Sequence, residues 1–272
     1  MLIDSHCHLD PEYLQGGPAP VLERAEAAGV GAFVCIGVGR DLRAARAAVS
    51  LADARANVFA TVGVHPHDAS GIDRAGFEEL ERLSRHPRVV AVGEVGLDYH
   101  YDHSPRDVQK TVFRRMIALA REVKKPLVIH TRSAPADTLC LLEEEGARDV
   151  GGIIHCFSED RPFAERALSL DFDLSFSGIL TFKTAHAIRD AAKWAPADRI
   201  LVETDSPFLA PVPLRGKPCE PAYIVHTAKY LADLRGAPLE SIAETTTANV
   251  VKRLSLASVP MARHDQREVR LG

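Results

Sequence analysis

Short apolar runs alternate with longer amphipathic stretches along the chain. The runs are rich in Val, Ile and Phe and are mostly continuous in apolarity, which is typical of parallel strands covered on both faces. This pattern predicts strands at residues 2–5, 32–36, 58–64, 89–95, 127–130, 152–155, 172–176 and 200–204.

The stretches between the strands have the period of amphipathic helices. Val112, Met116, Leu119 and Val123 recur at helical spacing, which places them on one face. Strands that alternate with helices predict an α/β fold, a single (β/α)8 TIM barrel, with an extra C-terminal helix at residues 239–254. An open doubly wound sheet is the alternative, but the chain has no G-x-G-x-x-G turn for a dinucleotide. We expect the barrel over residues 1–256 and a polar tail over 257–272.

Composition and charge narrow the class of protein. The chain has 272 residues, of which 46% are hydrophobic and 26% charged, and one barrel accounts for this length. It has neither an apolar run of roughly 18 residues, as needed to span a bilayer, nor a signal-peptide pattern at its start. Five cysteines without a C-x-x-C pair suit reduced thiols in a cytoplasmic protein. The net charge of −4 argues against a broad grip on long nucleic acid but permits a local phosphate site. We expect a monomer without a membrane partner.

Ionisable residues stand at the ends of five predicted strands. His6 and His8 form an H-x-H after the first strand, and because alternate residues share a face, both imidazoles should point into the barrel mouth. Barrel enzymes keep their chemistry at this end, where a buried ionisable side chain is costly unless it is paired or binds metal. A hydrogen-bonded polar network is the alternative. The pattern favours a divalent-metal site formed by His6, His8, Glu94, His130, His155 and Asp205.

The sequence around these positions resembles the TatD-like metal-dependent deoxyribonucleases of the amidohydrolase superfamily. The resemblance extends from Ile3 to about Leu254. It rests on the motifs I-D-S-H-C-H-L-D (3–10), G-V-H-P-H (63–67), G-E-V-G-L-D-Y (93–99), I-H-T-R (129–132), H-C-F-S (155–158) and E-T-D-S-P (203–207).

The resemblance implies hydrolysis of phosphodiester bonds in DNA, often from the 3′ end, by a metal-activated water. It implies one or two divalent cations held by the same six residues, and we expect two, Mg²⁺, Mn²⁺ or Zn²⁺, with Glu94 as a bridging ligand. Glu159 and Cys219 stand where the family often has Gly and Asn. Because both fall in loops expected near the mouth, they bear on substrate preference.

Two ligands have expected catalytic roles. Asp205 is the natural general base, because one carboxylate oxygen can hold metal while the other accepts a proton from water. Glu94 is the second catalytic residue, through the bridging role that the resemblance implies. His65 and Arg132 are predicted to bind the phosphate of the substrate. The expected partner is therefore nucleic acid, the chain ends of DNA.

Other polar residues are expected to support the site. Asp4 and Glu203 each stand two residues before a ligand, so they should face the barrel interior and support the ligands. Asp98 is expected to shape the loop after the fourth strand. Arg215 and Lys217, in a proline-rich loop, form either a positive rim or an ordinary solvated loop.

Two other functions fit the same residues. The same metal constellation attacks carbonyl carbon, so an amide or ester hydrolase, such as a deacylase of charged tRNA, is one alternative. A catalytically silent binding protein on a barrel scaffold is another. Loss of a ligand is its usual signature, and none of the six is missing.

Overall fold

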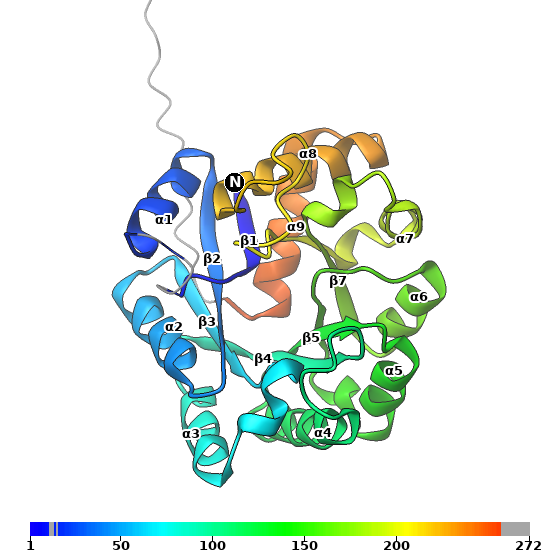
Figure 1. Ribbon diagram of the computed structural model, residues 1–272. Helices are drawn as coiled ribbons and strands as arrows, with labels where there is room; N and C mark the ends of the chain where they lie inside the picture. Colours follow the sequence, from blue (N-terminus) through cyan, green and yellow to red (C-terminus); the bar gives the residue numbers. More distant parts are fainter. Residues whose placement is uncertain (11–13, 15, 257–272) are drawn as a thin grey trace, which may run out of the picture.

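A barrel of eight parallel strands forms the centre of the computed structural model (Figure 1), which describes residues 1–10, 14 and 16–256. Each strand pairs in parallel with the next one along the chain. The strands are β1 (Leu2–Cys7), β2 (Val30–Val38), β3 (Val58–Gly63), β4 (Val89–Asp98), β5 (Leu127–Arg132), β6 (Gly152–Ile154), β7 (Phe172–Phe176) and β8 (Ile200–Val202). The predicted TIM barrel is confirmed.

The seam between β1 and β8 closes the barrel. Cys7 forms a parallel bridge with Ser206. Asp205 N donates to His6 O at 2.9 Å, and His8 N donates to Ser206 O at 2.8 Å. Since His6, His8 and Asp205 are predicted ligands, closure of the ring sets their relative positions.

Helices surround the strands (Figure 1). Buried side chains on their inner faces, such as Leu80, Phe113 and Leu142, belong to the large core between strands and helices. The helices are α1 (Pro18–Ala27), α2 (Arg43–Ala54), α3 (Arg74–Ser84), α4 (Arg106–Val123), α5 (Pro135–Glu144), α6 (Arg161–Ser169), α7 (His186–Trp194), α8 (Ile224–Arg235) and α9 (Leu239–Arg253).

Helix α9 closes the end of the barrel where the strands begin. Val250 and the following Leu254 pack with Ile3, Val34 and Leu201 in the core inside the barrel. The extra C-terminal helix is therefore confirmed. No helix in the part of the chain that the structure describes is long and apolar enough to cross a membrane. The predicted polar tail at residues 257–272 lies outside the described residues.

Strands β4 and β5 run further than the sequence predicted. The prediction ended them at residues 95 and 130, whereas they continue to Asp98 and Arg132, which are paired in register. The extension carries both residues to the open end of the barrel.

Candidate metal centre

The carboxyl ends of the strands surround a cavity of about 1060 Å³. This is the end of a barrel at which enzymes carry out their chemistry. His6 is fully buried and does not line the cavity itself. The other five predicted ligands line the cavity: His8, Glu94, His130, His155 and Asp205.

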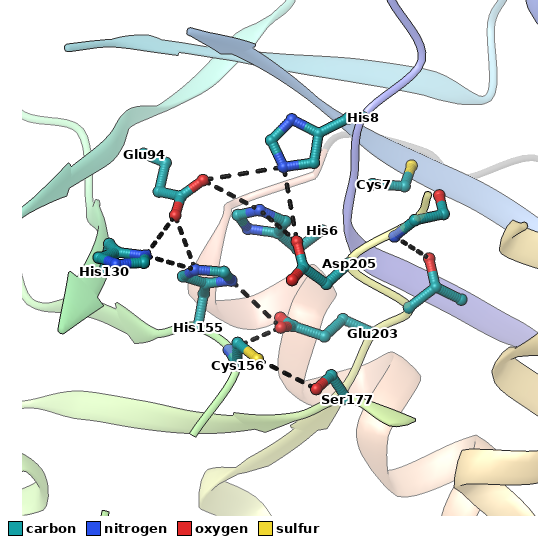
Figure 2. Close-up of polar contacts among 12 residues, drawn as sticks. His6, Cys7, His8, Glu94, His130, His155, Cys156, Ser177, Glu203 and Asp205 are labelled. Atoms are coloured by element: carbon teal, nitrogen blue, oxygen red, sulfur yellow. Dashed lines mark hydrogen bonds and ion pairs between the residues drawn. The ribbon is translucent and has the colours of Figure 1, made fainter. Parts of the chain in front are cut away.

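Glu94 lies between two groups of imidazoles (Figure 2). Its Oε1 is 2.8 Å from His130 Nδ1 and 2.8 Å from His155 Nε2, whereas its Oε2 is 3.4 Å from His6 Nε2. Burial would raise the pKa of Glu94, but the charge of His155 and hydrogen bonds from His130 and His155 hold this pKa well below its usual value. Glu94 is therefore ionised, with one oxygen toward each group.

The group facing Oε2 of Glu94 contains His6, His8 and Asp205. Asp205 Oδ1 lies 3.6 Å from His6 Nε2 and 3.5 Å from His8 Nε2. One ligand atom from each of the three residues lies within 4.8 Å of the others. Burial would raise the pKa of Asp205, but a hydrogen bond with His8 and the charge of His155 lower it. An anionic oxygen thus faces two imidazole nitrogens.

The donor set fits divalent ions, as the surroundings of His6 show. Both ring nitrogens of His6 are buried, and neither has a hydrogen-bond partner among the described residues. An unsatisfied buried polar group costs about 1–3 kcal/mol, and a cation beside Nε2 would remove this cost. Imidazole and carboxylate are the ligand types of zinc and manganese sites, and carboxylate also suits magnesium. The residues present therefore fit divalent cations.

Two further carboxylates hold two of the imidazoles from outside the cluster. Glu203 Oε1 lies 3.2 Å from His155 Nδ1, and Asp98 Oδ2 lies 3.2 Å from His130 Nε2. Each ring therefore lies between two carboxyl groups, with its outer nitrogen toward Glu203 or Asp98 and its inner nitrogen toward Glu94. Burial would lower both histidine pKa values, but Asp98 and Glu94 raise the pKa of His130, and Glu94 and Glu203 raise that of His155 well above its usual value. Glu203 thus supports a predicted ligand, as expected.

Asp4 forms hydrogen bonds with Thr204 and with the backbone of His6, and not with the side chain of a predicted ligand. Its buried carboxyl group accepts from Thr204 N at 2.9 Å, from Thr204 Oγ1 at 2.6 Å and from His6 N at 3.3 Å. Strict alternation predicted that Asp4 faces the interior together with His6, but β1 shifts register between Asp4 and Cys7. Asp4 therefore ties the two sides of the seam together, next to Asp205.

Both predicted substrate-binding residues line the cavity. His65 Nε2 lies 3.4 Å from Glu94 Oε1, and its ligand atom also groups with those of Glu94 and His130. Burial lowers the pKa of His65 to about 4, so its ring is neutral near pH 7. This position suits a metal ligand as well as a substrate contact, an option that the sequence did not suggest. Arg132 stands at the rim, with its guanidinium carbon 4.7 Å from the Tyr101 ring centroid.

Asp98 has a second role that the sequence analysis missed. Its Oδ1 accepts from His100 N and Tyr101 N, both at 2.9 Å, and so shapes the loop as expected. Its Oδ2 also lies 2.9 Å from His67 Nε2 and contacts His130. Burial would raise the pKa of Asp98, but hydrogen bonds from His130 and His67 hold it far below its usual value.

Four loop residues that the sequence placed near the mouth do not line the cavity. Among the described residues that line it, neither Arg215 nor Lys217 is present, and the Arg215 guanidinium packs 3.6 Å from the Phe182 ring centroid. The solvated-loop interpretation is therefore the better one for this pair. Glu159 and Cys219 are also absent from the lining, so their expected influence on substrate would have to be indirect.

Comparisons with known proteins identify the family of the chain. The family described as TatD related DNase matches residues 3–255. The chain is 43% identical over 254 residues to the uncharacterized metal-dependent hydrolase YabD of Bacillus subtilis, with coverage of 93% of this chain and 98% of that protein. It is 34% identical over 235 residues to the 3′-5′ ssDNA/RNA exonuclease TatD of Klebsiella pneumoniae, with coverage of 85% and 89%.

A solved structure extends the likeness to three dimensions. The TatD homologue YjjV of Escherichia coli K12 superposes with a TM-score of 0.87 at 28% identity, and covers 94% of this chain and 98% of that one. The barrel, the cluster at its mouth and these relatives define a metal-dependent hydrolase. The chain belongs to the TatD family.

Proposed function

We propose that this hydrolase cleaves phosphodiester bonds of DNA and removes nucleotides from a chain end. The observation that carries the proposal is Arg132, which lines the cavity and has no carboxylate partner among the described residues. Arg40 and Arg43, which also line it, pair with Asp68 and Asp41. An arginine with open donors beside a metal cluster suits a phosphate, which it can bind through two N–H groups. The exonuclease named among the relatives supports the same substrate class.

The cluster divides into two proposed ion sites that share Glu94. The contacts of Glu94 support this division, since Oε1 and Oε2 face different imidazoles. When bound, divalent ions lower the pKa of a water and neutralise charge that develops on a phosphate. The proposed ligands are His6, His8, Asp205 and Glu94 Oε2 for one ion, and His130, His155 and Glu94 Oε1 for the other.

Five side chains carry the remaining proposed roles. Asp205 accepts the proton of the attacking water, since its carboxylate is ionised and borders the cavity. His65, which is neutral near pH 7, either contacts the phosphate or leaving oxygen as a hydrogen-bonding group, or completes the ligand set. Arg132 binds a phosphate oxygen at the rim. Glu203 and Asp98 fix the rings of the ligands His155 and His130.

A chain end fits this site better than the interior of a duplex. The cluster lies at the base of the cavity, with His6 fully buried, so the reacting phosphate must enter the mouth. The net charge of −4 leaves few contacts for distant phosphates. An end that enters the barrel satisfies both conditions.

The test is cleavage of end-labelled linear and circular single-stranded DNA by metal-stripped protein, with and without Mg²⁺, Mn²⁺ or Zn²⁺. We expect a metal-dependent ladder from the linear strand alone. Equal cleavage of the circle would exclude end recognition. An aminoacyl ester is assayed in parallel, and if it alone is hydrolysed, the deacylase alternative replaces the nuclease.

A further inference from the structure

We infer that Tyr101, His103 and Arg132 form a nucleotide subsite at the rim of the cavity, here called the rim subsite. Its aromatic rings bind an unpaired base, and its guanidinium binds the adjacent phosphate. The inference rests on the proposed function and narrows its substrate to single-stranded nucleic acid.

The three side chains of the rim subsite lie together and line the cavity. The Tyr101 and His103 rings are stacked, with centroids 5.6 Å apart and planes at 6°. The guanidinium carbon of Arg132 lies 4.7 Å from the Tyr101 centroid. Tyr101 is 50% exposed, a large fraction for an aromatic side chain. The rim subsite therefore offers an aromatic surface and a cation within one small area.

This combination matches the chemistry of single-stranded nucleic acid. An unpaired base has an open π-face that stacks on aromatic side chains, and arginine contributes both stacking and phosphate contact. The bases of a duplex are stacked on one another and present only their edges in the grooves. A frayed or single-stranded end can occupy the rim subsite, whereas an intact duplex cannot.

The loop that carries Tyr101 is fixed before any substrate binds. Tyr101 N donates to Asp98 Oδ1 at 2.9 Å. The buried Gln109 donates to Asp98 O at 3.0 Å and to Ser104 O at 2.8 Å, and so spans both ends of the loop. A surface that is already ordered loses little entropy on binding. Asp98 also contacts His130. The rim subsite and the metal cluster are therefore held by the same residue, which fixes the distance between them.

A matched control exists on the outer surface. Arg115 in α4 lies 3.5 Å from the centroid of Phe77 in α3, and neither residue lines the cavity. It is therefore an arginine on an aromatic ring outside the proposed site. Arg115→Gln therefore shows how the loss of an arginine–aromatic pair affects the protein at a place that has no proposed role in binding.

The test compares 2′-deoxyadenosine 5′-monophosphate with 2-deoxyribose 5-phosphate by equilibrium binding to the metal-loaded protein. We expect the wild type to prefer the nucleotide. Tyr101→Ala should weaken nucleotide binding roughly five- to 160-fold, the range for loss of one stacked base, and leave the sugar phosphate unaffected. Tyr101→Phe should retain the preference, Arg132→Gln should weaken both ligands, and Arg115→Gln should change neither.

Equal affinity of the wild type for the two ligands would overturn the rim subsite, as would a preference that survives Tyr101→Ala. Tyr101 is exposed, so its replacement leaves the core intact, and circular dichroism checks this. The two proposals fail separately. If base preference depends on Tyr101 but no oligonucleotide is cleaved with any metal, the rim subsite stands and the nuclease proposal falls. If an oligonucleotide is cleaved but the preference for the nucleotide does not depend on Tyr101, the nuclease proposal stands and the rim subsite falls.

Discussion

The replacement Asp205→Asn separates metal binding from proton transfer. The amide nearly keeps the shape of the carboxylate but is neutral and a far weaker base. In the structure, Asp205 Oδ1 lies 3.5 Å from His8 Nε2 and 3.6 Å from His6 Nε2, so an amide oxygen can keep its place in the cluster. Loss of a general base lowers turnover by roughly 10²–10⁴-fold, which is about 2.7–5.4 kcal/mol of barrier.

The comparison variants are His6→Ala and His130→Ala. Each removes a nitrogen from the cluster and leaves Asp205 intact, so each should lose metal affinity and recover part of its turnover in excess metal. The assay is turnover on a single-stranded oligonucleotide across a metal titration, with metal content measured on the same samples. Asp205→Asn should retain at least one ion and stay slow at saturating metal. If saturating metal restores Asp205→Asn as fully as the histidine variants, Asp205 is only a ligand and the base lies elsewhere.

Three further outcomes are expected. A chelator should abolish hydrolysis and a divalent ion should restore it, because a metal-bound water is the proposed source of hydroxide; full turnover in stripped protein would contradict this. Glu94→Gln should reduce the metal content of the purified protein, since it removes the charge that faces both groups of imidazoles, and unchanged content would show that Glu94 is not shared. Asp98→Asn should weaken metal affinity roughly 10–100-fold, the usual cost of losing the outer partner of a ligating histidine, with turnover close to wild type at saturation; an unaltered metal titration would exclude that support role.

The barrel and the gathering of the six ionisable residues follow from simple features of the sequence. Continuous apolar runs between amphipathic stretches leave few folds open, and parallel strands in a barrel end at the same rim. A residue such as Asp205 at the end of one run must therefore approach Glu94 at the end of another, however far apart they lie in the chain.

The ends of β4 and β5 could not be predicted from the strand propensities of their residues. Gly93 and Gly96 weaken a predicted strand, because glycine inside a strand indicates either a break or a close backbone approach. The structure shows close approach: a Cβ at Gly96 would lie 1.9 Å from His130 O, and φ there is 144°. Pairing thus continues to Asp98, which explains why its contact with His130 was missed.

The orientation of Asp4 was wrong for a different reason. Alternation assumes an unbroken strand, and one register shift in β1 is enough to break it. Nothing in the residues between Asp4 and Cys7 marks the shift. The partner of Asp4, Thr204, lies on the other side of the seam, a contact that only the closed barrel creates.

The seam also matters while the protein is being made. His6 and His8 are synthesised before the rest of the barrel, whereas Thr204 and Asp205 follow only after β8, the last strand. Domains fold as units as the chain emerges, so a nascent chain that lacks β8 and the residues after it has His6 and His8 without Asp205, and Asp4 without its Thr204 donors. The proposed general base is therefore added only with the last part of the barrel. On this proposed role of Asp205, we expect a translation product that stops before β8 to lack hydrolytic activity, whatever the supply of metal in the cell.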